Sequence, residues 1–106
     1  MKQEEYLKQF KAATDNMFAI TSKKNQDYAE SADAFKNFRQ CELLGICRGD
    51  KGILVRMSDK MTRIANLLDH EAHVADEKIE DTLMDLAVYS IILSIYLKEQ
   101  RKMKKA

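Results

Sequence analysis

The chain has 106 residues, of which 45% are hydrophobic and 33% are charged, with a formal net charge of +1. This length fits a single domain over residues 1–106 with one core. The near balance of charge argues against binding of DNA, RNA or anionic lipid through a general basic field. Only two cysteines and a charged segment at residues 1–5 favour reduced thiols in a cytoplasmic protein over a secreted disulfide framework.

Helices should dominate the fold, because the chain has no proline and its three glycines lie together at Gly45, Gly49 and Gly52. A first amphipathic helix is predicted over residues 3–22, where apolar side chains recur at helical spacing. Residues 23–28 are polar and contain Asn25 and Asp27, which favour a break. We therefore expect the first helix to end before this segment.

A second helix is predicted over residues 31–44, with Ala34, Phe38 and Cys41 on one apolar line. We assign these side chains to the core and give them no chemistry. The glycine-rich residues 45–52 resemble a phosphate loop but do not match G-x-x-x-x-G-K-[ST], so a plain connection is predicted. Residues 69–76 contain both histidines in the order H-E-x-H. The H-E-x-x-H spacing of zinc helices is not met, and a solvated turn is expected.

The third helix, predicted over residues 53–68, has an apolar side and a charged side. The expected apolar side consists of Leu54, Met57, Met61, Ile64, Ala65 and Leu68. The charged side consists of Arg56, Asp59, Lys60 and Arg63.

The last helix, predicted over residues 76–102, also has two faces. One is an apolar stripe of Ile79, Leu83, Leu86, Ser90, Leu93 and Leu97, and the other has Glu77, Asp81 and Asp85 one turn apart. Because this second face continues as apolar residues, we expect Asp85 at the floor of a pocket, where a cation must meet it. The apolar run at residues 86–97 is too short to cross a membrane and indicates a buried helix.

These elements predict an all-α fold, a four-helix antiparallel bundle with short connections. Residues 86–97 are apolar nearly all round, so a monomer of this size would leave part of them exposed. A homo-oligomer is expected for this reason.

The two charged faces together predict a site for phosphate and a divalent metal. Carboxylates suit Mg²⁺, which keeps oxygen ligands and several waters, and Glu77, Asp81 and Asp85 supply such oxygens. Arginine and lysine match phosphate oxygens, the former in bidentate fashion. The same spacing would also arise from a salt-bridge ladder between two helices, and both interpretations stay open.

Three segments resemble the nucleotide modification associated domain family of phages and bacteria. They are residues 24–28 (K-N-Q-D-Y), residues 52–63 with R-x-x-D-K-x-x-R, and residues 74–89 with D-E-x-x-x-D-T-L-x-D-L-A-x-Y. The resemblance implies a relation to the MazG-like all-alpha NTP pyrophosphohydrolases and hence a nucleotide, Mg²⁺ and an oligomer. It departs from the paired acidic motifs of those enzymes, since the helix before the acidic one offers only Asp59.

Carried over by position, the resemblance implies a role for each of a small set of residues. Glu77 and Asp81 would be catalytic, and Asp85 would join them on the metal. The implied nucleotide-binding residues are Lys24, Asp27, Tyr28, Arg56, Asp59, Lys60, Arg63 and Tyr89.

Two functions of different class follow. The first is a Mg²⁺-dependent nucleotide hydrolase acting on a phosphoanhydride, with Arg56 and Lys60 neutralising developing charge. The second is a non-catalytic oligomer, phage-encoded and active in the host cytoplasm, that sequesters a nucleotide or a cyclic-nucleotide immune signal and stacks the base on Tyr28 or Tyr89. A helical interaction module with a salt-bridged core is the third alternative, and it predicts no ligand.

Overall fold

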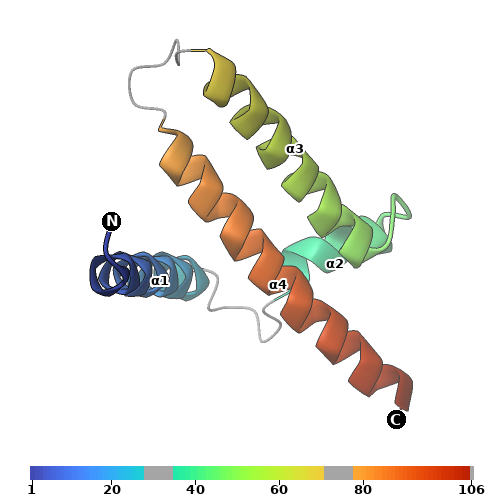
Figure 1. Ribbon diagram of the computed structural model, residues 1–106. Coiled ribbons are helices and arrows are strands. Elements are labelled where there is room, and N and C mark those ends of the chain that lie inside the picture. The colour runs from blue at the N-terminus through green and yellow to red at the C-terminus, as the bar shows by residue number, and fades with distance from the viewer. Residues whose placement is uncertain (28–34, 71–77, 106) are drawn as a thin grey trace. The chain divides into compact units, whose positions relative to one another are not determined.

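The computed structural model describes residues 1–27, 35–70 and 78–105. The described residues form four α-helices and no strand, which confirms the predicted all-α class. The chain divides into two compact units, Met1–Ala34 and Phe35–Ala106 (Figure 1). The helices are α1 (Gln3–Asp27), α2 (Lys36–Leu43), α3 (Gly49–Asp69) and α4 (Ile79–Lys105).

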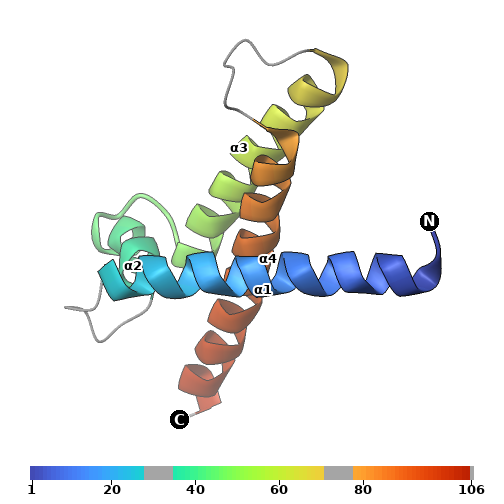
Figure 2. The same ribbon diagram turned by 90° about the vertical axis from the view of Figure 1, so that its left-hand side faces the viewer.

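In the first unit, α1 is one continuous helix (Figure 2). It runs through residues 23–27, so the break predicted there is wrong. The reason is that asparagine and aspartate cost a helix only tenths of a kcal/mol, about 0.7 at most, and no glycine or proline is present to stop it. Its exposed face carries a Lys11–Asp15 ion pair at 2.8 Å and a Tyr6–Phe10 ring contact, both between residues one turn apart.

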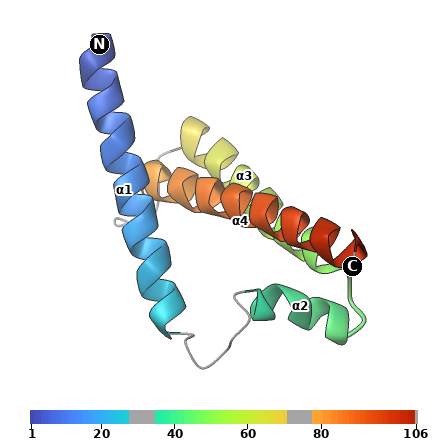
Figure 3. The same ribbon diagram turned by 90° about the horizontal axis from the view of Figure 1, so that it is seen from below.

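In the second unit, α3 and α4 form an antiparallel pair (Figures 1 and 3). Their facing side chains recur at alternating steps of four and three residues, the spacing of a coiled-coil seam. In α3 the seam is Ile53, Met57, Lys60, Ile64 and Leu67, and in α4 it is Thr82, Leu86, Tyr89, Leu93, Tyr96 and Gln100, all of them buried or half-buried. Ile53, Ile64 and Tyr96 are the most buried apolar side chains of this seam.

The seam is rotated away from the apolar stripes predicted for the two helices. Leu54, Met61 and Leu68 were expected to face the core but are at least half exposed, and Leu83 and Leu97 are exposed as well. Lysine and tyrosine occupy the inner positions in their place, because each buries a long apolar body and keeps a polar end near the edge. The hairpin therefore leaves a second apolar surface uncovered, and the four-helix bundle stays a prediction.

The starts of three helices also differ from those predicted. The α2 helix begins at Lys36, whereas residues 31–34 of the predicted helix lie outside the described residues. The α3 helix begins at Gly49, inside the segment predicted as a plain connection. For α4, Lys78 precedes the helix, and residues 76 and 77 are likewise outside the described part of the chain.

The Glu42 carboxylate of α2 explains the early start of α3. It accepts hydrogen bonds from the backbone N–H of Gly49 and, at 3.2 Å, from the Tyr96 hydroxyl of α4. The first N–H groups of a helix lack partners within the helix, so a carboxylate placed there stabilises its first turn. Phe35 packs edge-on against Tyr96, with ring centroids 5.2 Å apart, and joins the same cluster. Glu42 thus connects α2, α3 and α4.

None of the described helices is both long and apolar enough to cross a bilayer.

Candidate functional site

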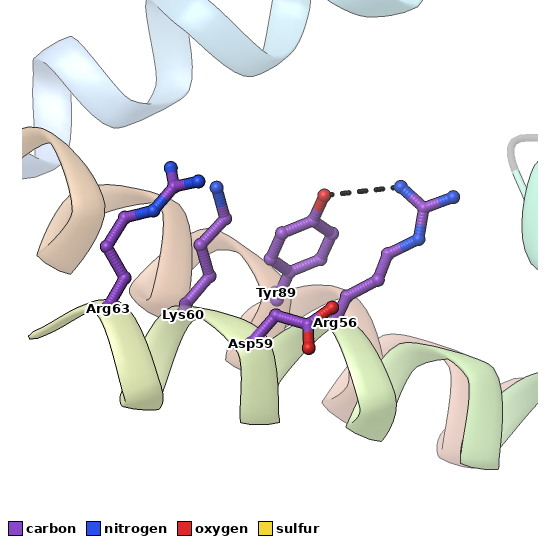
Figure 4. A pocket seen from close by; sticks show the side chains of 5 residues that line it. All are labelled: Arg56, Asp59, Lys60, Arg63 and Tyr89. Atoms are coloured by element: carbon purple, nitrogen blue, oxygen red, sulfur yellow. Dashed lines mark hydrogen bonds between the residues drawn. The ribbon is translucent and has the colours of Figure 1, made fainter.

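A pocket of about 390 Å³ opens between the middle of α3 and α4. Its lining consists of Arg56, Asp59, Lys60, Arg63 and Tyr89. The first four recur along one edge of α3 at near-helical spacing, and Tyr89 reaches the same place from the α4 side of the seam. Figure 4 shows the charged ends of the three cations extending in the same general direction as the Tyr89 hydroxyl, while the Asp59 carboxylate stays close to the helix.

Arg56 is positioned by two aromatic side chains. One guanidinium nitrogen donates to the Tyr89 hydroxyl at 3.4 Å, which Figure 4 marks, and the guanidinium carbon lies 5.6 Å from the centre of the Phe38 ring. A cation at this distance from an aromatic ring is attracted by the ring's quadrupole. The side chain of Arg56 is therefore held at the pocket although it is exposed.

Lys60 lies in the helix seam and forms an ion pair with Asp85 of α4, with 3.1 Å between the nitrogen and the carboxylate oxygen. The lysine side chain is 22% exposed and the aspartate side chain 43% exposed. A cation therefore contacts Asp85 as predicted, but the carboxylate is part-exposed and does not lie at the floor of the pocket. The Lys60–Asp85 pair is also one interhelical ion pair of the kind that the salt-bridge interpretation predicts between α3 and α4.

The predicted metal ligands are only partly described. Asp81 is exposed in the first turn of α4, and Asp85, one turn later, is paired with Lys60. Neither lines the pocket. Among the described residues, no group of three or more His, Cys, Asp or Glu side chains is placed to hold a metal ion. These two aspartates do not form a metal site by themselves, and the third predicted ligand, Glu77, lies outside the described residues.

Other predicted site residues also fall outside the description. Tyr28 is among the residues that the structure leaves undescribed. Lys24 and Asp27 belong to the backbone of α1, but their side chains are not described. The roles implied for Lys24, Asp27 and Tyr28 stay predictions.

Phe38, predicted to belong to the core without chemistry, contacts a cation of the pocket with its ring. Its apolar spacing along α2 gives no sign of this contact. Only the crossing of α2 near the beginning of α3 brings the ring to Arg56, and that placement depends on the chain reversal between the two helices. The sequence carries no signal for this contact.

A family model described as Nucleotide modification associated domain 1 matches residues 24–97. The chain belongs to this family. The resemblance drawn from the three sequence segments is thereby confirmed. The segment matched by Nucleotide modification associated domain 1 contains α2, α3 and most of α4, and with them every residue that lines the pocket. Neither the curated proteins nor the solved structures include a match to the chain.

Proposed function

We propose that the pocket between α3 and α4 binds the phosphate groups of a nucleotide. The observation that carries the proposal is the gathering of Arg56, Lys60 and Arg63 around one pocket in a chain of near-zero net charge. Two guanidinium groups and one ammonium supply donors that match phosphate oxygens. The volume of the pocket lies at the lower end of the range for small-molecule sites, which suits a phosphate chain or a compact nucleotide.

Four of the five lining residues have individual proposed roles. Arg56 is held ready by Tyr89 and Phe38, so little side-chain freedom is lost on binding. Lys60 offers a point charge to the phosphate. The Asp59 carboxylate repels phosphate and is better suited to accept a hydrogen bond from a sugar hydroxyl or a base amino group. Tyr89 offers its ring to the base.

Hydrolysis of the bound nucleotide is the second candidate. It is favoured by Asp85, which lies 3.1 Å from a cation of the pocket, and by Asp81 one turn before it on the same helix. A Mg²⁺ ion held by Glu77, Asp81 and Asp85 would supply Lewis-acid chemistry next to the phosphates. The catalytic alternative is a hydrolase related to the MazG-like pyrophosphohydrolases. The non-catalytic alternative is a protein that sequesters a nucleotide or a cyclic-nucleotide immune signal and so acts against host defence.

The test is a binding and turnover assay with a mixed panel of NTPs, dNTPs and cyclic signalling nucleotides. Purified protein is incubated with the panel, with and without Mg²⁺, and the filtrate is quantified by mass spectrometry before and after heat denaturation. Depletion of a nucleotide with appearance of a new product supports hydrolysis. Depletion followed by return of the intact nucleotide on heating supports sequestration. An unchanged panel would overturn the proposed site in favour of the salt-bridge interpretation.

A matched pair of variants locates the binding. Arg56→Ala should weaken affinity about tenfold or more, because it removes charge-assisted hydrogen bonds to phosphate. Lys51→Ala removes one positive charge from an exposed position on the same helix, outside the pocket lining, and should leave the affinity nearly unchanged. Equal losses in both variants would indicate general charge attraction and contradict a defined pocket.

A further inference from the structure

The end of α2 reverses the chain through a Schellman motif. The N–H of Ile46 donates to the carbonyl of Cys41 at 2.9 Å, and the N–H of Gly45 donates to the carbonyl of Glu42 at 2.9 Å. Gly45 has φ +73°, the left-handed conformation that this motif places just after the helix. The reversal folds the following residues back over the last turn of α2.

This reversal brings Cys47 back to Cys41. The N–H of Cys47 also donates to the carbonyl of Cys41, at 3.3 Å, so the two backbones are in direct contact. A disulfide requires Cα atoms about 4.4–6.8 Å apart, and a backbone hydrogen bond between two residues keeps their Cα atoms at a separation of this order. Both thiols are free and half-buried.

The two sulfur atoms converge over Gly52 in the first turns of α3. A Cβ atom built on Gly52 would lie 2.9 Å from the Cys41 sulfur and 3.9 Å from the Cys47 sulfur. The missing side chain therefore leaves room for both sulfur atoms at one place. The pKa of the Cys47 thiol is raised by partial removal from water and by its hydrogen bond with Cys41, in agreement with this closeness.

We propose that Cys41 and Cys47 form a reversible intramolecular disulfide by exchange with a small-molecule disulfide of the glutathione type. One cysteine thiolate attacks the oxidant, breaks its S–S bond, forms a mixed disulfide and releases one thiolate. The second cysteine thiolate then attacks the protein sulfur of the mixed disulfide, closes the internal S–S bond and expels the other thiolate. Two electrons pass from the protein to the oxidant, and the two protons of the cysteines end on the two released thiols.

The bond would fasten the end of α2 to the segment that leads into α3. Cys41 now donates its S–H to the carbonyl of Phe38 at 2.8 Å, and this hydrogen bond is lost when the disulfide closes. The inference is independent of nucleotide binding, because neither thiol lines the pocket.

The test compares the folded chain with the same chain in concentrated guanidinium chloride. Each is equilibrated at mildly alkaline pH in glutathione buffers of stepped redox ratio, quenched with acid, alkylated and weighed by intact mass spectrometry. The folded chain should be half oxidised in a buffer that is about tenfold or more reducing than the buffer that half oxidises the denatured chain. The reason is that the fold holds the two thiols together. Equal midpoints, or oxidation mainly to disulfide-linked dimers, would overturn the proposal.

Two substitutions at Gly45 test the geometry without touching either cysteine. Apart from the two neighbouring residues, no atom of the described part of the chain lies within 4 Å of a Cβ built there, so a side chain meets only the conformational cost of the positive φ. Gly45→Val should move the midpoint towards that of the denatured chain, since a β-branched residue resists the left-handed region. Gly45→Asn should keep most of the effect, because asparagine tolerates it. Identical midpoints for Gly45→Val and the unsubstituted chain would contradict the role of the reversal.

Discussion

Lys60 already forms an ion pair with one carboxylate, and it is also proposed to contact the phosphate that binds in the pocket. Its stem lies in the helix seam, and its ammonium group lies 3.1 Å from Asp85 while also lining the pocket. A bound phosphate would share this ammonium group with the carboxylate. The two interpretations of Asp85, as ion-pair partner and as metal ligand, therefore predict opposite effects when its charge is removed.

Asp85→Asn separates them. If Asp85 acts as the ion-pair partner, the variant frees Lys60 and removes a nearby negative charge, so nucleotide affinity measured without metal should rise about threefold or more. The free energy of unfolding should fall by about 0.5–1 kcal/mol, the value of a part-exposed ion pair. Isothermal titration and urea unfolding measure the two effects. A loss of affinity that appears only with Mg²⁺ present would instead support metal ligation.

Tyr96 predicts how stability depends on alkaline pH. Its side chain is buried, and its pKa is raised by burial and then by the Glu42 carboxylate. A group with a raised folded pKa stabilises the protein fully below its unfolded pKa, about 10 for tyrosine, and this contribution is lost as pH rises through the folded value. Urea unfolding should therefore show a decline above about pH 10. Tyr96→Phe should flatten this decline, whereas Tyr6→Phe in the exposed face of α1 should not.

At the scale of elements, the sequence was informative about which helices exist and less so about their faces. The absence of proline and the clustered glycines predicted helices correctly, and the spacing of Arg56, Lys60 and Arg63 placed them on one edge. Of the apolar residues predicted to face inward, Met57, Ile64, Leu86 and Leu93 do lie in the seam, but hydrophobicity alone does not predict the polar residues beside them. The seam also contains Lys60, Thr82, Tyr89 and Tyr96, and the polar ends of Lys60 and the two tyrosines have partners on other helices.

The start of α3 at Gly49 is also not predictable from the local sequence, because it too depends on contacts with another helix. A glycine-rich segment favours a loop in isolation, but Gly49 is fixed by a carboxylate seven residues earlier. Such a cap depends on the tertiary placement of α2. Local sequence therefore gave no indication that the helix would begin there.

Gly49→Ala should destabilise the protein by about 1–3 kcal/mol, the cost of overpacking. An added Cβ would overlap the Tyr96 hydroxyl and lie 2.8 Å from the ring carbon that carries it. Thermal or urea unfolding measures the loss. A double-mutant cycle with Tyr96→Phe provides the control, because removing the hydroxyl should recover part of the loss. Strict additivity of the two substitutions would contradict the contact.

At the scale of the molecule, the exposed apolar residues are the main observation. Leu54, Val55, Met61 and Leu68 of α3 and Leu83, Ile91 and Ile95 of α4 are exposed in the second unit, and Tyr6, Phe10 and Phe18 in the first. An apolar surface of this kind costs free energy in water and is usually covered in solution. Further helices packed against these exposed residues would cover them in the way that helix bundles cover their apolar faces.

We expect the purified protein to be a homo-oligomer at micromolar concentration. Multi-angle light scattering should give a mass that is a multiple of 12.3 kDa. Leu68→Lys, at a strongly exposed apolar position near the end of α3, should shift the distribution towards monomer, while Lys51→Glu at an exposed polar position should not. A monomer that keeps a cooperative unfolding transition would show that the chain covers these faces itself.

Glu42 makes the docking of α2 observable at a single backbone atom. Because its carboxylate holds the Gly49 amide, α2 cannot move away from the hairpin without exposing that amide to solvent. Hydrogen exchange at Gly49 therefore reports the local opening of α2, separately from the global unfolding that governs amides in the middle of α3. Glu42→Ala should speed exchange at Gly49 far more than at Ile64, and the difference between the two rates measures how independently the short helix opens.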